Sequence, residues 1–208
     1  MNIQIWSDFL CPYCLLGKKR LENALKAAGI KDARVEVKSF LLNPGAPRGG
    51  ASMRGALMDK YGYSGADVDE NFRELAQAGR ELGLALDFEG ARDASTDRAH
   101  ALFQYAKAKG QGTAFSDRLQ QAGFMEGEVL DDEATLLKLA GEVGIREEEA
   151  RAALRDEGNF TRARAEYEEA LRYGARGVPF FVIDDRFAIT GAQPEEVFIR
   201  TLEKAAAR

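Results

Sequence analysis

Both cysteines of the chain lie in one short stretch, DFLCPYCLLG at residues 8–17, with Pro12 and Tyr13 between them. Two thiols at this spacing can act as a redox pair, form a disulfide staple or supply half of a metal site. A staple here would close a very short loop and restrain the unfolded chain little. Zinc needs four ligands, and the chain adds a single histidine, His100, to the two thiols. The spacing therefore favours a redox centre, and we expect no bound metal.

The residues around this stretch predict that the cysteines lie at the start of a helix. Residues 2–7 alternate polar and apolar side chains, as a strand does, and apolar or small residues then recur at helical spacing as far as Gly29. Unpaired N–H groups and the positive end of the helix dipole stabilise a thiolate at that place. We expect Cys11 to be the exposed nucleophile and Cys14, one turn later, to be the buried resolving thiol. Pro12 suits the first turn of a helix.

A second motif, GVPFFVI at residues 177–183, precedes a predicted hairpin. Pro179 is either a strand-start proline or the proline of a cis-proline loop beside the cysteines. In the second case Val178 would offer its backbone to an extended substrate as an added strand. The place of this proline before a hairpin, far along the chain from the cysteines, favours the cis-proline loop. We expect Tyr13 to form part of the lip around the sulfur.

Two further side chains are weaker candidates for a role at the site. Asp8 precedes Cys11 by three residues and is either a buried acid that exchanges a proton with Cys14 or a turn residue. His100 is either a packed, hydrogen-bonded histidine or a titrating functional group, and packing is favoured.

The order of predicted elements defines the fold. Residues 34–40 form a second strand, which a crossover helix makes parallel to the first. The turn-forming segment 43–50 follows, and residues 51–173 have mostly helical periodicity. A hairpin through Asp184 and Asp185 and a helix beginning near Pro194 complete the chain. This is an α/β thioredoxin fold (β-α-β … β-β-α) with an inserted all-helical subdomain. We predict that residues 1–50 and 159–208 form the thioredoxin-like domain and residues 51–158 the insertion.

Composition limits the classes of partner and the compartment. The 208 residues are 45% hydrophobic and 30% charged, with a net charge of -5, which argues against nucleic acid or an anionic membrane as a partner. No segment approaches the roughly 20 apolar residues that cross a bilayer. The start MNIQIWSDF lacks the features of a secretory signal, so with Met1 as the native start we expect a cytoplasmic protein.

With both motifs in view, the chain resembles the FrnE-like branch of the DsbA family of thiol-disulfide oxidoreductases. The resemblance implies that Cys11 is the nucleophile, Cys14 the resolving thiol and Pro179 a cis-proline. It also implies a helical domain that covers the redox site. Members usually have Trp between the cysteines and an aromatic residue just after them, where this chain has Tyr13 and Leu15. The segments that carry the resemblance are DFLCPYCLLGKKRLE, SFLLNPGAPRGG, KYG at 60–62, AHALFQYAKAKG at 99–110, FMEGEVLDD at 124–132, GVPFFVID and ITGAQPEEVF.

We therefore expect a dithiol-disulfide oxidoreductase, or a disulfide isomerase, acting on disulfide-containing proteins or glutathione mixed disulfides. No bound cofactor is expected, with glutathione a candidate reductant or co-substrate. One alternative is a glutathione-dependent isomerase or transferase of a small aromatic substrate. The resemblance suggests this alternative because 2-hydroxychromene-2-carboxylate isomerases and kappa-class glutathione transferases share the architecture, typically with serine at the reactive position. A third possibility is a non-catalytic, chaperone-like binding module.

Overall fold

The computed structural model describes residues 1–46 and 48–207 and divides the chain into two compact units. One comprises Met1–Leu42 and Ala163–Arg208, the other Asn43–Arg162, whereas the sequence placed the boundaries at 50/51 and 158/159. A contact explains the first difference. The backbone N–H of Gly49 donates to the Asp131 carboxylate at 3.0 Å and so ties the loop before residue 51 to the helical unit. At the second boundary, both the predicted and the observed positions lie inside one helix, Glu157–Arg172, which contributes to both units. Pro47, within the predicted turn segment 43–50, lies outside the described residues.

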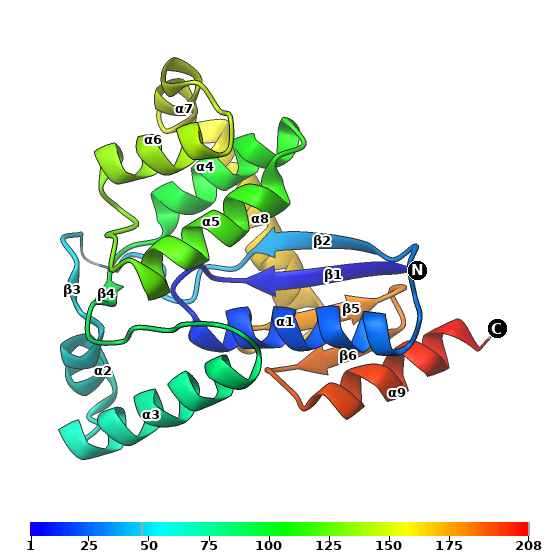
Figure 1. Cartoon of the computed structure of the whole chain (residues 1–208). Helices are drawn as coiled ribbons and strands as arrows, with labels where there is room; N and C mark the ends of the chain where they lie inside the picture. Colours follow the sequence, from blue (N-terminus) through cyan, green and yellow to red (C-terminus); the bar gives the residue numbers. More distant parts are fainter. Residues whose placement is uncertain (47, 208) are drawn as a thin grey trace. The chain divides into compact units, whose positions relative to one another are not determined.

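The first unit contains a four-stranded sheet of order β2-β1-β5-β6 (Figure 1). Strand β1 pairs in parallel with β2 and in antiparallel fashion with β5, which forms a hairpin with β6. The parallel pairing is the one that the crossover helix predicted, and this order confirms the thioredoxin fold. The strands are β1 (Asn2–Ser7), β2 (Arg34–Ser39), β5 (Phe180–Ile183) and β6 (Phe187–Thr190).

Helices α1 (Pro12–Ala27) and α9 (Glu195–Ala206) cover one face of this sheet. Alternate residues of β1 point to that face because side chains of a strand alternate between its two sides. Their buried side chains share an apolar cluster with residues of the hairpin and both helices. The fully or nearly fully buried members are Ile3, Ile5, Leu21, Ala24, Phe181, Ile183, Ile189, Phe198, Leu202 and Ala205.

The opposite face packs on the second half of α8 (Glu157–Arg172). Trp6 is fully buried there, and its indole N–H donates to the backbone carbonyl of Glu166 at 2.8 Å. The Glu166 carboxylate in turn accepts from the backbone N–H of Ser39 at 2.6 Å. Lys38 lies 5.0 Å from the centre of the Trp6 ring and 2.6 Å from the Glu169 carboxylate. Polar groups of α8 therefore fasten this helix to the ends of β1 and β2.

The predicted hairpin and final helix are confirmed. Asp184 and Asp185 both adopt left-handed backbone angles, with φ of 49° and 53°, which aspartate tolerates better than most residues. The Asp184 carboxylate accepts from the backbone N–H of Asn2 at 2.7 Å. Pro194 is the N-cap of α9 rather than a residue of its first turn, and Glu195 and Glu196 occupy that turn near the positive helix end.

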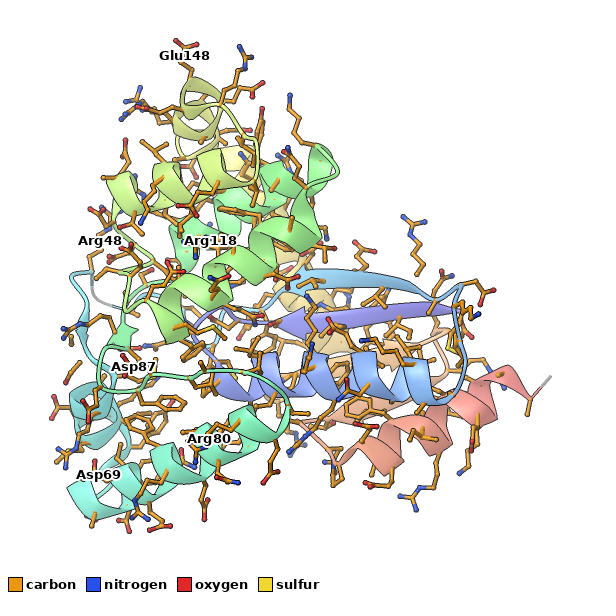
Figure 2. All side chains as sticks on the ribbon, viewed as in Figure 1. Arg48, Asp69, Arg80, Asp87, Arg118 and Glu148 are labelled. Atoms are coloured by element: carbon orange, nitrogen blue, oxygen red, sulfur yellow. The ribbon has the colours of Figure 1, made fainter. Side chains whose placement is uncertain are left out.

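The second unit is mainly helical, as predicted, with one short strand pair that the sequence did not reveal. Strands β3 (Ala51–Ser52) and β4 (Arg92–Asp93) pair over only two residues each, too few for a period-two pattern to show. Arg118, labelled on α5 in Figure 2, donates to the carboxylates of Glu126 and Glu142 and links α5 to α6. The helices are α2 (Met53–Tyr61), α3 (Gly65–Glu81), α4 (Asp97–Ala108), α5 (Gly112–Met125), α6 (Glu133–Glu142), α7 (Glu147–Ala153) and the first half of α8.

Among the described residues, no helix combines the length and apolar character that a membrane span requires.

The aromatic pair at the centre of the first core gives a stability prediction. Phe181 is fully buried, with its ring edge-on to Phe198 at a centroid distance of 4.9 Å. Phe181→Ala should lower the free energy of unfolding by about 3–5 kcal/mol because it removes apolar contacts and leaves a cavity. Urea denaturation followed by circular dichroism measures this change. The control Tyr63→Ala, at a side chain 54% exposed, should change stability by less than about 0.5 kcal/mol. Equal effects of the two substitutions would contradict the assigned core.

Candidate active site at the start of helix α1

The CPYC stretch forms the junction between β1 and α1. Cys11 is the N-cap residue, with an extended backbone, and Pro12 occupies the first helical position, as the sequence predicted. The backbone N–H of Cys11 donates to the carbonyl of Asp8 at 3.3 Å, and that of Cys14 donates to the carbonyl of Cys11 at 3.0 Å. Both thiols therefore belong to one tight turn at the positive end of α1, and both are free rather than joined in a disulfide.

Cys11 differs from the sequence prediction in one respect: it is buried rather than exposed. Only 4% of its surface is accessible, against 1% for Cys14. The sequence prediction of exposure came from the local position of Cys11 at a helix end. It took no account of a segment far along the chain that packs on this thiol. That segment contains Val178, whose carbonyl oxygen lies 3.7 Å from the Cys11 sulfur and accepts a hydrogen bond from the thiol. Contact with Val178 takes up surface that the thiol would otherwise present.

The Val178–Pro179 peptide bond lies beside the cysteines and is cis. Val178 is half-buried, so part of this segment remains accessible next to Cys11. The Pro179 carbonyl accepts from the backbone N–H of Gly191 at 2.8 Å, which holds the segment against the end of β6. Gly191 has a φ of 78°, a left-handed angle that suits glycine. The structure thus brings together the two motifs, 167 residues apart in sequence, on which the sequence prediction depended.

Gly17 is a residue of this site whose role the sequence did not indicate. A Cβ atom at its position would lie 2.9 Å from Pro179 Cγ and 3.1 Å from the ring of Phe181. Only a residue without a side chain lets α1 approach the proline so closely. Arg20, one turn further along α1, donates to the carbonyl of Ala192 at 2.6 Å and anchors the chain just after β6. The sequence showed Gly17 only as one small residue in a helical stripe.

The two thiols have unequal environments. Burial is the largest influence on Cys14, and it raises the pKa of this thiol well above its ordinary value. A hydrogen bond to Cys11 and the charge of Cys11 raise the pKa of Cys14 further, whereas hydrogen bonds from the Ser7 side chain and the Asp8 backbone lower it. At neutral pH Cys14 therefore keeps its proton. A buried, protonated thiol suits the role of the resolving cysteine.

Asp8 is buried directly after β1, and its carboxylate bridges two loops. One oxygen accepts from the backbone N–H of Leu10 at 3.1 Å, the other from that of Leu42 at 2.8 Å. These bonds join the turn before Cys11 to the segment after β2. They match the turn-residue interpretation of Asp8, and its exchange of a proton with Cys14 stays a prediction.

The remaining candidates lie in different surroundings. Tyr13 is 43% exposed beside the half-buried Pro12. His100 is fully buried in α4 of the helical unit. Within residues 1–46 and 48–207 no group of three or more His, Cys, Asp or Glu side chains is arranged to hold a metal ion.

Comparison with known families identifies this arrangement. The family model of the DSBA-like thioredoxin domain matches residues 2–203. The chain belongs to the DsbA-like thioredoxin family.

Two individual proteins are similar to this chain over nearly its whole length. The crystal structure of a probable DsbA oxidoreductase, SCO1869 from Streptomyces coelicolor, is 35% identical with a TM-score of 0.95, over 100% of this chain and 91% of that one. The uncharacterized protein YwbO of Bacillus subtilis is 29% identical over 97% of this chain and 96% of its own.

Two more distant structures show the shared fold alone. The cytosolic disulfide reductase DsbM from Pseudomonas aeruginosa, solved with GSH, is 22% identical with a TM-score of 0.62 over 100% of both chains. A 2-hydroxychromene-2-carboxylate isomerase is 19% identical with a TM-score of 0.72, over 100% of this chain and 95% of that one.

The close contact of Gly17 predicts that replacing glycine by alanine changes stability in opposite directions at two helical positions. Gly17→Ala should destabilise the protein by about 1–3 kcal/mol because the added methyl group meets the rigid Pro179 ring and buried Phe181. Gly141→Ala, in α6 with nothing within 4 Å of the added atom, should stabilise it by about 0.5–1 kcal/mol. Thermal unfolding of both variants measures the difference. A neutral Gly17→Ala would contradict the close contact of α1 and Pro179.

The unequal thiols give a second prediction, on chemical reactivity. At pH 7 iodoacetamide should label Cys11 at least about tenfold faster than Cys14, whose protonated, buried sulfur is a poor nucleophile. Because the pKa of Cys14 is raised, its labelling should accelerate only above the pH at which an ordinary cysteine ionises. Peptide mapping by mass spectrometry across a pH series measures both rates. Equal labelling of the two thiols at neutral pH would argue against the assignment of roles.

Proposed function

We propose that this protein is a dithiol-disulfide oxidoreductase that exchanges disulfides with proteins or glutathione through Cys11 and Cys14. The observation that carries the proposal is the geometry of the pair: Cys11 caps α1 beside the Val178 carbonyl, and a protonated Cys14 lies one turn behind it. The family assignment and the similarity to a probable DsbA oxidoreductase support it.

The proposed reaction proceeds in two exchange steps. The Cys11 thiolate attacks one sulfur of a substrate disulfide, forms a mixed disulfide, and releases the other substrate sulfur as a thiolate that takes up a proton. Cys14 then loses its proton and attacks the Cys11 sulfur. This second step forms the Cys11–Cys14 disulfide and releases the remaining substrate thiol. The reverse sequence reduces the Cys11–Cys14 disulfide, so oxidation, reduction and isomerisation of substrates use the same two residues.

We assign substrate contact to the groups around the Cys11 sulfur. The half-buried Val178 backbone lies beside the sulfur and can align an extended segment as an added strand, with Pro179 anchored behind it. Pro12 and the exposed Tyr13 provide the lip on the side of α1. Glutathione suits this site as reductant or co-substrate because it is a short, extended thiol peptide. The shared fold of DsbM, solved with GSH, is consistent with that choice.

The sequence motifs further support placement in the FrnE-like branch and a cytoplasmic location. A pair of free thiols separated by two residues is typical of catalytic rather than structural cysteines in a reducing compartment. DsbM, which shares the fold, is a cytosolic disulfide reductase.

The proposed function predicts that blocking the second step traps partners. Cys14→Ala should accumulate mixed disulfides at Cys11 with cellular proteins and glutathione because no resolving thiol remains. Non-reducing electrophoresis followed by mass spectrometry of the trapped adducts measures this. The matched control Cys11→Ala retains Cys14 but should trap at least about tenfold less, since Cys14 is buried and protonated.

The same pair of variants separates the other functions. A glutathione-dependent isomerase of a small aromatic substrate should keep its turnover when Cys14 is replaced by serine, as no resolving thiol is needed. A chaperone-like module should retain its activity when both cysteines are replaced. Absence of any adduct in Cys14→Ala would overturn the oxidoreductase proposal.

A further inference from the structure

Ser7, the last residue of β1, faces the resolving cysteine. Ile3 and Ile5 of β1 share a buried cluster with Leu21 and Ala24 of α1. Because side chains alternate along a strand, Ser7 points to the same face as Ile5. On α1, Cys14 precedes Leu21 by seven residues, about two turns, and so lies on the same helix face as Leu21. Two residues further along β1 and two turns back along α1, Ser7 and Cys14 therefore lie on facing sides of the two elements at their active-site end.

The hydrogen bonds of Cys14 agree with this register. Its sulfur has a hydrogen bond with the Ser7 side chain, another with the Asp8 backbone and a third with Cys11. Because a sulfur anion can only accept, the partners that favour it must donate, and these are the Ser7 hydroxyl and the Asp8 N–H. The Ser7 hydroxyl also has a long contact of 3.5 Å to the Asp8 carbonyl, and rotation of the O–H away from this weak acceptor turns its proton to the sulfur. Ser7 is 4% exposed and Cys14 is 1% exposed, so water has little access to replace either donor.

We propose that the Ser7 hydroxyl and the Asp8 backbone N–H hold the Cys14 sulfur as a thiolate during the resolving step. Ser7 is then a catalytic residue of the second exchange, in direct contact with a reacting atom. This inference rests on the proposed oxidoreductase function and assigns to it a residue outside the CPYC stretch. The preorganised donors resemble an oxyanion hole, with a sulfur anion in place of oxygen.

The contacts also explain why Cys14 reacts only after Cys11. Before exchange, the hydrogen bond to Cys11 and the charge of Cys11 both favour protonated Cys14. In the mixed disulfide the Cys11 sulfur is bonded to the substrate and carries no charge, so both influences disappear. The donors from Ser7 and Asp8 remain and oppose the effect of burial.

The resolving step balances in electrons and protons. The Cys14 thiolate donates an electron pair to the Cys11 sulfur and forms the Cys11–Cys14 bond. The bond between Cys11 and the substrate breaks, and its electron pair leaves on the substrate sulfur. The proton released by Cys14 to solvent is matched by the proton that the departing sulfur takes up. With glutathione disulfide as oxidant, one disulfide is reduced to two glutathione molecules and the dithiol is oxidised.

The test is a two-phase oxidation of the reduced, full-length protein by glutathione disulfide. Rapid acid quenching and mass spectrometry follow the glutathione adduct of Cys11, which forms in the first phase and disappears in the second. Ser7→Ala should slow the second phase by about tenfold or more, the value of a hydrogen bond to a charged sulfur acceptor. Its first phase should stay within about twofold of the wild type, since Ser7 does not take part in that step.

Ser39→Ala is the matched control. Ser39 is the cross-strand partner of Ser7 in the β1–β2 register and is fully buried as well. Its removal deletes a buried hydroxyl from the same end of the sheet, so a general packing effect would appear in both variants. We expect both phases of Ser39→Ala to stay within about twofold of the wild type.

The pH dependence of the second-phase rate separates a catalytic role of Ser7 from a structural one, because a structural role would leave it unchanged. The second-phase rate of the wild type should rise with pH as Cys14 ionises, and Ser7→Ala should shift this rise to higher pH because a donor to the thiolate is lost. β5 brings only the apolar Phe181 and Ile183 to this face. In the part of the chain that the structure describes, the contacts place two titratable groups beside Cys14: Cys11, and the Asp8 carboxylate held by the N–H groups of Leu10 and Leu42. Lys18, which pairs with Glu22, follows one turn on along α1.

The outcomes are distinct. If the wild type forms neither the glutathione adduct nor the Cys11–Cys14 disulfide, and Cys14→Ala traps no protein, the proposed function itself fails. If the adduct forms and Ser7→Ala resolves it at the wild-type rate and pH, the role of Ser7 is wrong while the oxidoreductase function stands. Equal slowing of both phases, or equal slowing in Ser39→Ala, would likewise overturn the catalytic role of Ser7 in favour of packing.

Discussion

The close packing of Gly17 against Pro179 is the constraint on which the candidate site depends. A side chain on Gly17 would meet the proline ring and the buried Phe181, so the bare helix surface sets how near α1 comes to the Val178–Pro179 segment. That approach places the Cys11 sulfur 3.7 Å from the Val178 carbonyl. The Pro179 carbonyl accepts from the N–H of Gly191, and Arg20 of α1 donates to the carbonyl of Ala192. The residues just after β6 therefore hold both the proline segment and α1 in place.

Once this contact is made, the difference between the two thiols follows from their positions. Cys11 caps the helix, where the dipole is positive, and lies beside the half-buried Val178. Cys14 lies under the first turn, where burial keeps it protonated. Disulfide exchange needs this inequality, because two equally reactive thiols would compete for the substrate. In the proposed resolving step, hydrogen bonds from Ser7 and Asp8 oppose the effect of burial on the Cys14 thiol.

The far face of the sheet is organised by polar contacts around a buried tryptophan. Glu166 accepts from the Trp6 indole through its carbonyl and from the Ser39 N–H through its carboxylate. Lys38 is nearly buried, paired with Glu169 and positioned over the Trp6 ring. Such pairs contribute little net stability once their desolvation is counted. The strand ends that carry Ser7 and Asp8 are therefore held from both faces.

Local sequence patterns predicted the order of elements in the first unit, the thioredoxin fold, the parallel pairing of the first two strands and the cysteine pair at a helix start. These features rest on local periodicity, turn residues and spacing, which act over a few residues. The tertiary structure decided the burial of Cys11, the contact of Gly17 with Pro179, and the bond between Asp8 and Leu42. It also decided where the helical unit begins, because the N–H of Gly49 bonds to Asp131. Each of these joins residues far apart in the chain, and no local pattern encodes the distance between such residues once the chain has folded.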